Sequence, residues 1–291
     1  MEDWLLLAII AIMMYGSSMA AQKLALGGMS SASMILFSLL IALPMFLAVL
    51  VWIILTGEIW TIGADSLAYA IIGATFGQAG YYTYVEAAKR GPISIVASLT
   101  ATYPAMVAVV AIVFLGEMIT PVQGGGVVLV MAGIVTLSYF HGRSAEKKAA
   151  SKGYYVICIV TVFIWGLWAI FAKLALIGMS NIAFLSIYSL IIPPVTLAYY
   201  RLSRIRIRDV WPKWGTAVKI AIVSSVVGNL AYFVEVTAID SGPAPVVFPL
   251  IASSPLVVIL LAFAFLKERL SKIEWTMVAL VVIGIILVST Q

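Results

Sequence analysis

The sequence predicts an all-α membrane protein in which ten transmembrane helices form two inverted five-helix repeats around a central cavity. Three observations predict this fold class: the composition, the spacing of the apolar runs and an internal repeat. Hydrophobic residues make up 64% of the 291 residues and charged residues only 10%. Because a soluble domain has about 45–50% apolar and about 25% charged residues, this composition excludes a soluble enzyme and a nucleic-acid-binding protein.

The ten predicted spans are apolar runs separated by charged residues, Gly and Pro, and a bilayer-spanning helix needs about 20 such residues. In the first half they cover 4–26, 31–55, 66–87, 93–115 and 121–140. In the second half they cover 154–177, 182–201, 215–238, 245–266 and 272–290. Two starts carry capping boxes, Thr120–Gln123 and Ser271–Glu274, in which a hydroxyl and a longer polar side chain satisfy free backbone N–H groups.

The orientation follows from the basic residues. All 17 Lys and Arg residues except Lys173 lie in or beside the odd-numbered connections between spans. Loops rich in Lys and Arg stay in the cytoplasm, so both termini are predicted to be extracytoplasmic. We expect an integral, multi-pass protein of the plasma membrane.

The second half of the chain repeats the first. Lys23-Leu24-Ala25-Leu26 recurs as Lys173-Leu174-Ala175-Leu176 at an offset of 150 residues, and Gly91-Pro92 recurs as Gly242-Pro243 at 151. The predicted domains are therefore a first repeat at 1–140, a basic cytoplasmic linker at 141–153 and a second repeat at 154–291. Each repeat has an odd number of spans, so the halves enter the membrane in opposite orientations. Inverted repeats of this kind are typical of alternating-access carriers.

Both halves carry the same motifs in the same order. An aromatic residue and Gly, Tyr15-Gly16 or Trp165-Gly166, are followed by Lys in the first span of each half. Gly-Pro precedes the fourth span, Pro lies within it, and a turn follows it, Leu-Gly-Glu at 115–117 or Leu-Lys-Glu at 266–268. On these features the chain resembles the EamA-type branch of the drug/metabolite transporter superfamily over nearly all of 4–290. The resemblance implies an exporter of small polar metabolites such as amino acids, with a cavity lined by the first four spans of each half. It does not identify the substrate, because relatives handle amino acids, sugars, nucleotides and drugs.

Four charged residues inside or near the ends of spans are candidates for gating or coupling. An ammonium or carboxylate there is costly unless it reaches the headgroups, pairs or lines a wet cavity. We expect Lys23–Glu86 to close the inner mouth and Lys173–Glu235 the outer one. A local helix pair of Glu86 with Lys89 or Arg90 is an equally good interpretation. Glu235 has no basic neighbour in sequence and is the better candidate for a proton-coupling site.

Polar and aromatic residues near the middle of spans are candidates for the cavity wall. Gln78 and Asn229 align at the 151-residue offset, and a mid-membrane amide must find hydrogen bonds either between helices or with a substrate. Aromatic rings also anchor at headgroups, but Tyr15 and Trp165 lie closer to span centres. The aromatic candidates are Tyr15, Tyr81, Tyr82, Tyr103, Trp165, Trp168 and Tyr232.

Other classes fit less well. The single histidine, His141, and the single cysteine, Cys158, do not form a catalytic or metal-binding set, and the sequence has no HExxH or GxSxG motif. No enzyme activity, metal or cofactor is therefore expected. A multidrug or organic-cation efflux carrier is the alternative within carriers, and a channel or a non-transporting scaffold is the alternative outside them. The expected partners are a small-molecule substrate and the lipid bilayer, with no nucleic acid, and the protein is expected as a monomer or homodimer.

Overall fold

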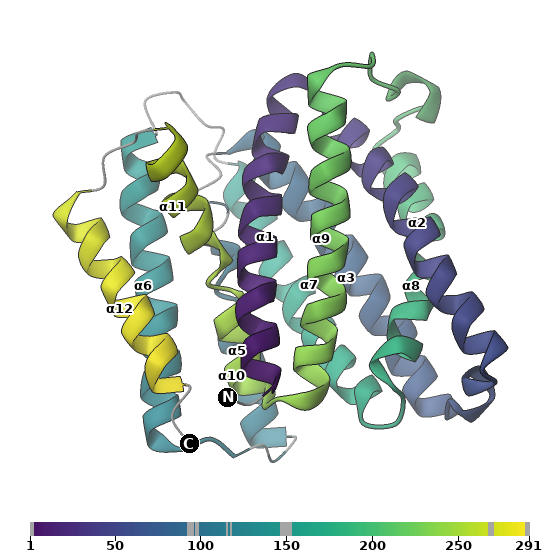
Figure 1. Cartoon of the computed structure of the whole chain (residues 1–291). Helices are drawn as coiled ribbons and strands as arrows, with labels where there is room; N and C mark the ends of the chain where they lie inside the picture. The colour runs from purple at the N-terminus through teal and green to yellow at the C-terminus, as the bar shows by residue number, and fades with distance from the viewer. Residues whose placement is uncertain are drawn as a thin grey trace.

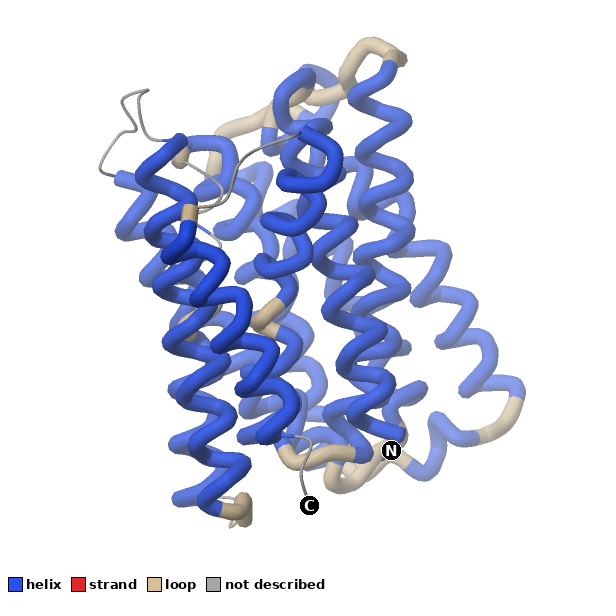
Figure 2. Tube along the Cα trace, turned by 60° about the vertical axis from the view of Figure 1, so that its left-hand side comes forward, coloured by secondary structure: helices blue, strands red, loops and turns tan. Residues whose placement is uncertain are grey.

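The computed structural model describes residues 3–91, 96, 99–114, 116, 118–145, 153–266 and 271–288. Within these ranges the chain forms α-helices and two short 3₁₀ turns, and no strand is present (Figure 2). Six helices are long and apolar enough to cross a membrane by length and composition. The all-α prediction is confirmed for this part of the chain.

The helices follow the predicted spans closely, with exceptions described below. In the first half they are α1 (Asp3–Gly28), α2 (Ser31–Leu55), η1 (Glu58–Thr61), α3 (Ala64–Arg90), α5 (Tyr103–Phe114) and α6 (Pro121–Ala145). In the second half they are α7 (Gly153–Leu176), α8 (Asn181–Leu202), η2 (Ile207–Asp209), α9 (Thr216–Ser241), α10 (Ala244–Ile251), α11 (Ser254–Leu266) and α12 (Lys272–Val288).

Local sequence fixes several helix starts. Ser30 and Ser180 are repeat-equivalent N-caps of α2 and α8, and each accepts a hydrogen bond from the backbone N–H three residues later, at 3.0 Å. The capping box at the start of α6 is confirmed, because the backbone N–H groups of Thr120 and Gln123 each donate to the other's side chain, at 3.0 and 3.2 Å. In the second predicted box, the side chain of Glu274 lies outside the described residues.

The predicted span 245–266 is a broken helix, which corrects the expectation of one continuous span. It divides into α10 and α11 at Ala252–Ser253. Pro255 has no N–H to offer the carbonyl of Ile251, one turn earlier, and the hydroxyl of Ser254 donates to that carbonyl instead. The predicted span 93–115 lies partly outside the described residues. Val96, Leu99 and Thr100 are helical, a turn follows at Ala101 and Thr102, and α5 begins at Tyr103, just before Pro104.

Helices from the two halves alternate in the packing (Figure 1). The most extensive helix pairs are α1 with α9, α3 with α7, α6 with α12 and α2 with α8, and each pair contains one helix from each half. Since α1 corresponds to α7 and α3 to α9 in the repeat, the first two pairs are equivalent. Figure 1 shows α1 and α9 as antiparallel neighbours at the centre of the molecule.

Close helix contacts occur at repeat-equivalent glycines. A Cβ on Gly16 would lie 2.3 Å from the Cβ of Val257, and one on Gly166 would lie 2.7 Å from the sulfur of Met106. Gly16 and Gly166 are 150 residues apart, and Met106 and Val257 are 151 apart. The same two repeat positions therefore pack together twice, once at Gly16 and once at Gly166. A small residue at this position lets the backbones approach closely.

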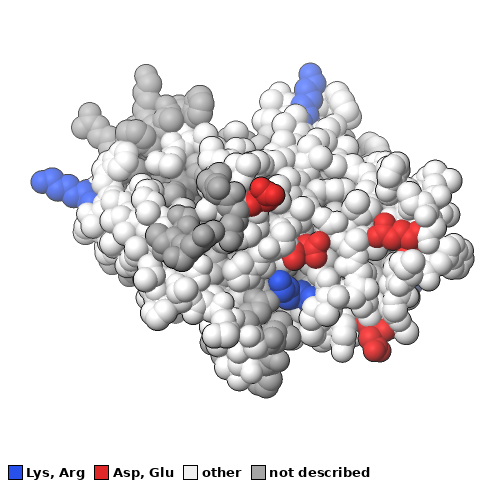
Figure 3. All heavy atoms as spheres, turned by 60° about the horizontal axis from the view of Figure 1, so that its bottom comes forward, with Lys and Arg blue, Asp and Glu red and all other residues white. Residues whose placement is uncertain are grey.

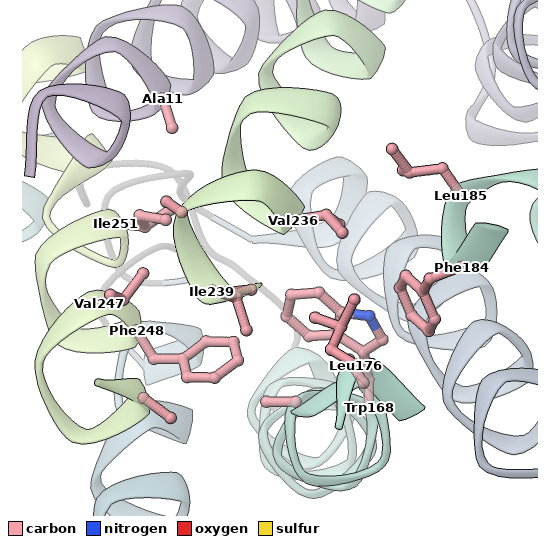
Figure 4. Packing of buried hydrophobic residues seen from close by; sticks show 14 of the residues in the cluster. Ala11, Trp168, Leu176, Phe184, Leu185, Val236, Ile239, Val247, Phe248 and Ile251 are labelled. Carbon is pink, nitrogen blue, oxygen red and sulfur yellow. The ribbon is translucent and has the colours of Figure 1, made fainter. Parts of the chain in front are cut away.

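Two main hydrophobic clusters occupy opposite ends of the helix bundle. One combines the N-terminal part of α1, the C-terminal parts of α7 and α9, the start of α8, and α10. Figure 4 shows part of it, including Trp168, Phe184, Ile239 and Phe248. The other combines the opposite ends of these helices with the start of α2 and the end of α3. The cavity described below lies between these two clusters.

The outer surface matches a lipid environment. Large apolar side chains such as Met13, Val51 and Val128 are more than half exposed, which is the pattern expected where lipid replaces water as the solvent. Figure 1 places the two chain ends at the same side of the molecule. Figure 3 looks onto that side and shows acidic side chains spread across it, with basic ones sparse.

Candidate functional site

A cavity of about 210 Å³ lies between the two halves of the protein. Its walls come from α1, α2, α3 and α5 of the first half and from α7, α8, α9, α10 and α11 of the second. Repeat-equivalent residues face it from both halves, including Gln78 with Asn229 and Tyr81 with Tyr232. A hollow at the junction of two repeats is where carriers of this architecture bind their solutes.

Most of the predicted cavity residues line this hollow. They are Tyr15, Gln78, Tyr81, Tyr103, Trp165, Trp168, Asn229 and Tyr232. Tyr82 does not: its ring is buried in the neighbouring hydrophobic cluster, and its hydroxyl is hydrogen-bonded to Thr196. Tyr81 and Tyr82 are consecutive on α3 and point about 100° apart, and it is Tyr81 that faces the cavity.

Two glycines on one face of α3 position the tryptophans of α7. A Cβ on Gly77 would lie 2.7 Å from the Cδ1 of Trp168, and one on Gly80 would lie 2.4 Å from the Cδ1 of Trp165. The missing side chains leave room for the indole rings against α3. The Nε1 of Trp168 also donates to the hydroxyl of Tyr232, at 3.3 Å, which ties this ring to α9.

Among the described residues, one carboxylate faces the cavity. Glu235 on α9 is only 3% exposed, and its Oε2 accepts a hydrogen bond of 2.5 Å from the hydroxyl of Tyr15 on α1. The equivalent positions in the other half hold Tyr84 and Trp165, whose rings stack with centroids 5.4 Å apart. The repeat therefore places a phenol–carboxylate pair on one side of the cavity and an aromatic pair on the other.

Neutral polar groups line the part of the cavity toward the C-terminal end of α1. The Nε2 of Gln22 donates to the hydroxyl of Tyr81, at 2.9 Å, and Ser18 donates to the carbonyl of Ser224, at 2.8 Å. The hydroxyls of Tyr84 and Ser225 are buried and have no hydrogen-bond partner among the described residues. Since a buried polar group without a partner is costly, these two hydroxyls lower the stability of the described structure.

The two ends of the cavity differ although the repeat makes them equivalent. At one end, a Cβ on Gly73 of α3 would lie 3.2 Å from the backbone nitrogen of Ala172 on α7, so the two helices are in close contact. The corresponding positions at the other end, Ser224 and Gln22, line the cavity. The hollow therefore extends toward the end of the bundle where α1 finishes.

The predicted pair Lys23–Glu86 is not formed in this conformation. Lys23 is exposed. Glu86 forms a 3.0 Å ion pair with Arg90, one turn along the same helix, and accepts hydrogen bonds from Ser31 at 2.6 Å and Tyr199 at 2.5 Å. The alternative of a local helix pair thus describes Glu86, which holds the start of α2 and the end of α8 against α3.

The repeat supports a structural role for this contact. The positions equivalent to Ser31 and Glu86 are Asn181 and Thr237, and the side chain of Asn181 donates to that of Thr237, at 3.0 Å. In each half, the first residue of the second helix is therefore fastened to the third helix by a polar contact. Neither contact lies on the cavity wall.

The predicted pair Lys173–Glu235 is also not formed in this conformation. The Nζ of Lys173 donates to the carbonyls of Ile239 and Gly242, at 3.0 and 3.1 Å, at the C-terminal end of α9. A positive charge is favourable at a helix C-terminus, where free carbonyls gather. This contact gives Lys173, the one basic residue outside the odd-numbered connections, a partner within the protein.

Sequence analysis missed several wall residues, notably Gln22, Ser38, Tyr84 and Tyr188. Ser38 and Tyr188 are equivalent at the 150-residue offset, and Tyr84 is equivalent to Glu235 at 151. Applying the repeat to each candidate would have found Tyr84. No group of acidic, histidine or cysteine side chains in the described part of the chain could hold a metal ion.

The comparisons with known proteins agree with this architecture. The sequence matches the EamA-like transporter family over residues 3–139 and 152–290, one match for each repeat. The chain belongs to the EamA-like transporter family, whose members are membrane transporters and not enzymes. It is thus a multi-pass membrane protein of the drug/metabolite transporter type. No curated protein matches it significantly by sequence.

A solved structure titled "Crystal structure of protein" has the same fold. It is 18% identical, with a TM-score of 0.75, and the alignment covers 99% of this chain and 96% of that one. At this level of identity the similarity concerns the fold alone.

Proposed function

We propose that this protein is a secondary transporter that exports small polar metabolites by alternating access. The single observation that carries the proposal is a cavity walled by repeat-equivalent residues of both halves, with Gln78 and Asn229 as its matched amides. The cavity extends to Ser224 and Gln22 but not to the equivalent Gly73 and Ala172, and this asymmetry supports exchange between two states in which the ends alternate.

The proposed topology has ten spans across the plasma membrane, with both termini on the extracytoplasmic side. The order of the described helices supports this count when α10 and α11 are taken as one broken span and α5 as part of another. Broken helices at mid-membrane are tolerated where they line a cavity, and Ala252 and Ser254 do so here.

Glu235 is the proposed site of proton coupling. It is the carboxylate of the described cavity wall, it is buried, and Tyr15 holds one of its oxygens. Ionisable residues inside membrane proteins commonly form proton relays in transporters. In this proposal Glu235 takes up a proton in one state and releases it in the other.

The test is counterflow in liposomes that contain the purified protein. Labelled amino acids, amines, sugars and nucleotides would be screened with and without a pH gradient, and protein-free liposomes set the background. We expect saturable uptake of one class, stimulated by the gradient in the wild type and no longer gradient-dependent in Glu235→Gln. Absence of counterflow for every class, or ionic conductance in its place, would contradict a carrier and favour a scaffold or a channel.

Multidrug efflux is the second candidate, and the aromatic walls with one carboxylate favour it. The cavity volume argues against it, because drug-sized ligands occupy pockets of about 300–1,000 Å³ and this one measures about 210 Å³. A screen of large aromatic cations in the same liposomes separates the two candidates.

A further inference from the structure

The charges at the cavity wall are unbalanced. Glu235 is an acid, and no Lys, Arg or His lines the cavity among the residues the structure describes. Lys173 is engaged with the end of α9, Lys23 is exposed, and Arg90 pairs with Glu86 away from the wall. An ionised Glu235 has no cationic partner there.

The groups that face Glu235 are phenols. Tyr15 on α1, Tyr103 on α5, Tyr188 on α8 and Tyr232 on α9 all interact electrostatically with its carboxylate. No charged side chain faces it from the described parts of the helices packed around it. Aromatic faces attract cations, and the attraction strengthens where water is excluded.

The broken helix does not supply a site for an anion. A helix N-terminus binds anions through free backbone N–H groups. At the start of α11, Pro255 has no N–H, and the N–H of Leu256 donates to the carbonyl of Ser253, at 2.8 Å. A ligand carboxylate would therefore add a second negative charge to a cavity whose described wall has no basic side chain.

We propose that the solute bound in this cavity is a small organic amine that carries one positive charge and no carboxylate. Its ammonium group pairs with Glu235 among the tyrosines, and its apolar part lies against Trp165 and Trp168. The inference rests on the proposed function, and it narrows the predicted substrates from amino acids to amines.

The test compares two molecules that differ in one group. Phenethylamine is phenylalanine without its carboxylate, so their binding to the full-length detergent-solubilised protein isolates the effect of that charge. Isothermal titration at pH 7 is expected to show phenethylamine binding at least about tenfold more tightly than phenylalanine. Glu235→Gln is expected to weaken phenethylamine binding by about tenfold or more, because an ion-pair hydrogen bond is lost.

Two further variants make the test specific. Asp65→Asn removes a carboxylate from the exposed first turn of α3, outside the cavity, and is expected to leave phenethylamine affinity unchanged. Glu235→Asp keeps the negative charge and is expected to retain the preference for phenethylamine, which separates loss of charge from loss of folding. Equal or tighter binding of phenylalanine, or full phenethylamine affinity in a folded Glu235→Gln, overturns the proposal.

Failure of this inference is distinguishable from failure of the proposed function. Counterflow of phenylalanine without counterflow or binding of phenethylamine would leave the transporter intact and overturn the amine. Binding of phenethylamine that depends on Glu235, with no counterflow of any solute, would support the ligand class and contradict transport.

Discussion

Two glutamates on equivalent helices have different surroundings at the level of single residues. Under the 151-residue offset Glu86 corresponds to Thr237 and Glu235 to Tyr84, so the two carboxylates point about 160° apart around their helices. Glu235 faces the cavity, whereas Glu86 fastens α2 and α8 to α3. The direction in which each glutamate points from its helix therefore decides whether it faces the cavity or a neighbouring helix.

We predict that Tyr15→Phe destabilises the protein. The substitution removes the hydroxyl that donates to buried Glu235, and loss of a hydrogen bond to a charged group costs about 1.5–3 kcal/mol. Thermal unfolding in detergent should show a lower Tm. Tyr155→Phe is the control because that side chain is 40% exposed, and an equal effect of the two changes would contradict the role of Tyr15.

Tyr84→Phe should have the opposite effect on stability. Its hydroxyl is buried with no partner among the described residues, so its removal relieves a desolvation penalty of about 1–3 kcal/mol at most. We expect an unchanged or higher Tm in the absence of solute. A clear drop in Tm without solute would indicate that the hydroxyl already has a partner in the protein.

At the level of elements, glycine determines how closely helices approach. The crossing of α6 and α12 illustrates this: a Cβ on Gly126 would lie 2.8 Å from the backbone oxygen of Gly284, and one on Gly133 would lie 2.6 Å from Val281. The sequence run Gly124-Gly125-Gly126 predicts close packing without identifying the partner helix. The structure assigns Gly126 to the contact with α12, while a Cβ on Gly125 would meet nothing within 4 Å.

Gly126→Ala is therefore predicted to be destabilising and Gly125→Ala is not. A methyl group at 126 meets backbone atoms that cannot rotate away, and overpacking of this kind typically costs about 1–3 kcal/mol. At 125 the added methyl group contacts no other atom, and Ala has a higher helix propensity than Gly. Parallel melting curves of the two variants measure the difference. A destabilised Gly125→Ala would place a further contact, such as one between two copies of the protein, at this face.

At the level of the whole molecule, the repeat explains both the symmetry and its exceptions. Equivalent pairs, α1 with α9 and α3 with α7, form the centre of the bundle. The cavity is asymmetric, because Ser224 and Gln22 line it whereas the equivalent Gly73 and Ala172 do not.

The topology prediction concerns the whole chain. Basic residues concentrate in the odd-numbered connections, and Figure 1 places both termini at the opposite end of the molecule from the basic segment 201–213 that leads into α9. We expect a reporter at the C-terminus to be active only outside the cytoplasm, and a cysteine introduced at Arg206 to react with a permeant thiol reagent only. Cytoplasmic activity of the C-terminal reporter would reverse the orientation.

The sequence by itself determined the membrane class, the two repeats, the family and some of the residues of the cavity wall. These properties depend on hydrophobicity and spacing along the chain, and both can be read directly from the order of the residues. Only the tertiary structure decided the partners of Glu86, Lys173 and Glu235 and the break between α10 and α11. The partner of a side chain depends on how each helix is rotated and where it crosses its neighbours, and distant segments of the chain set both.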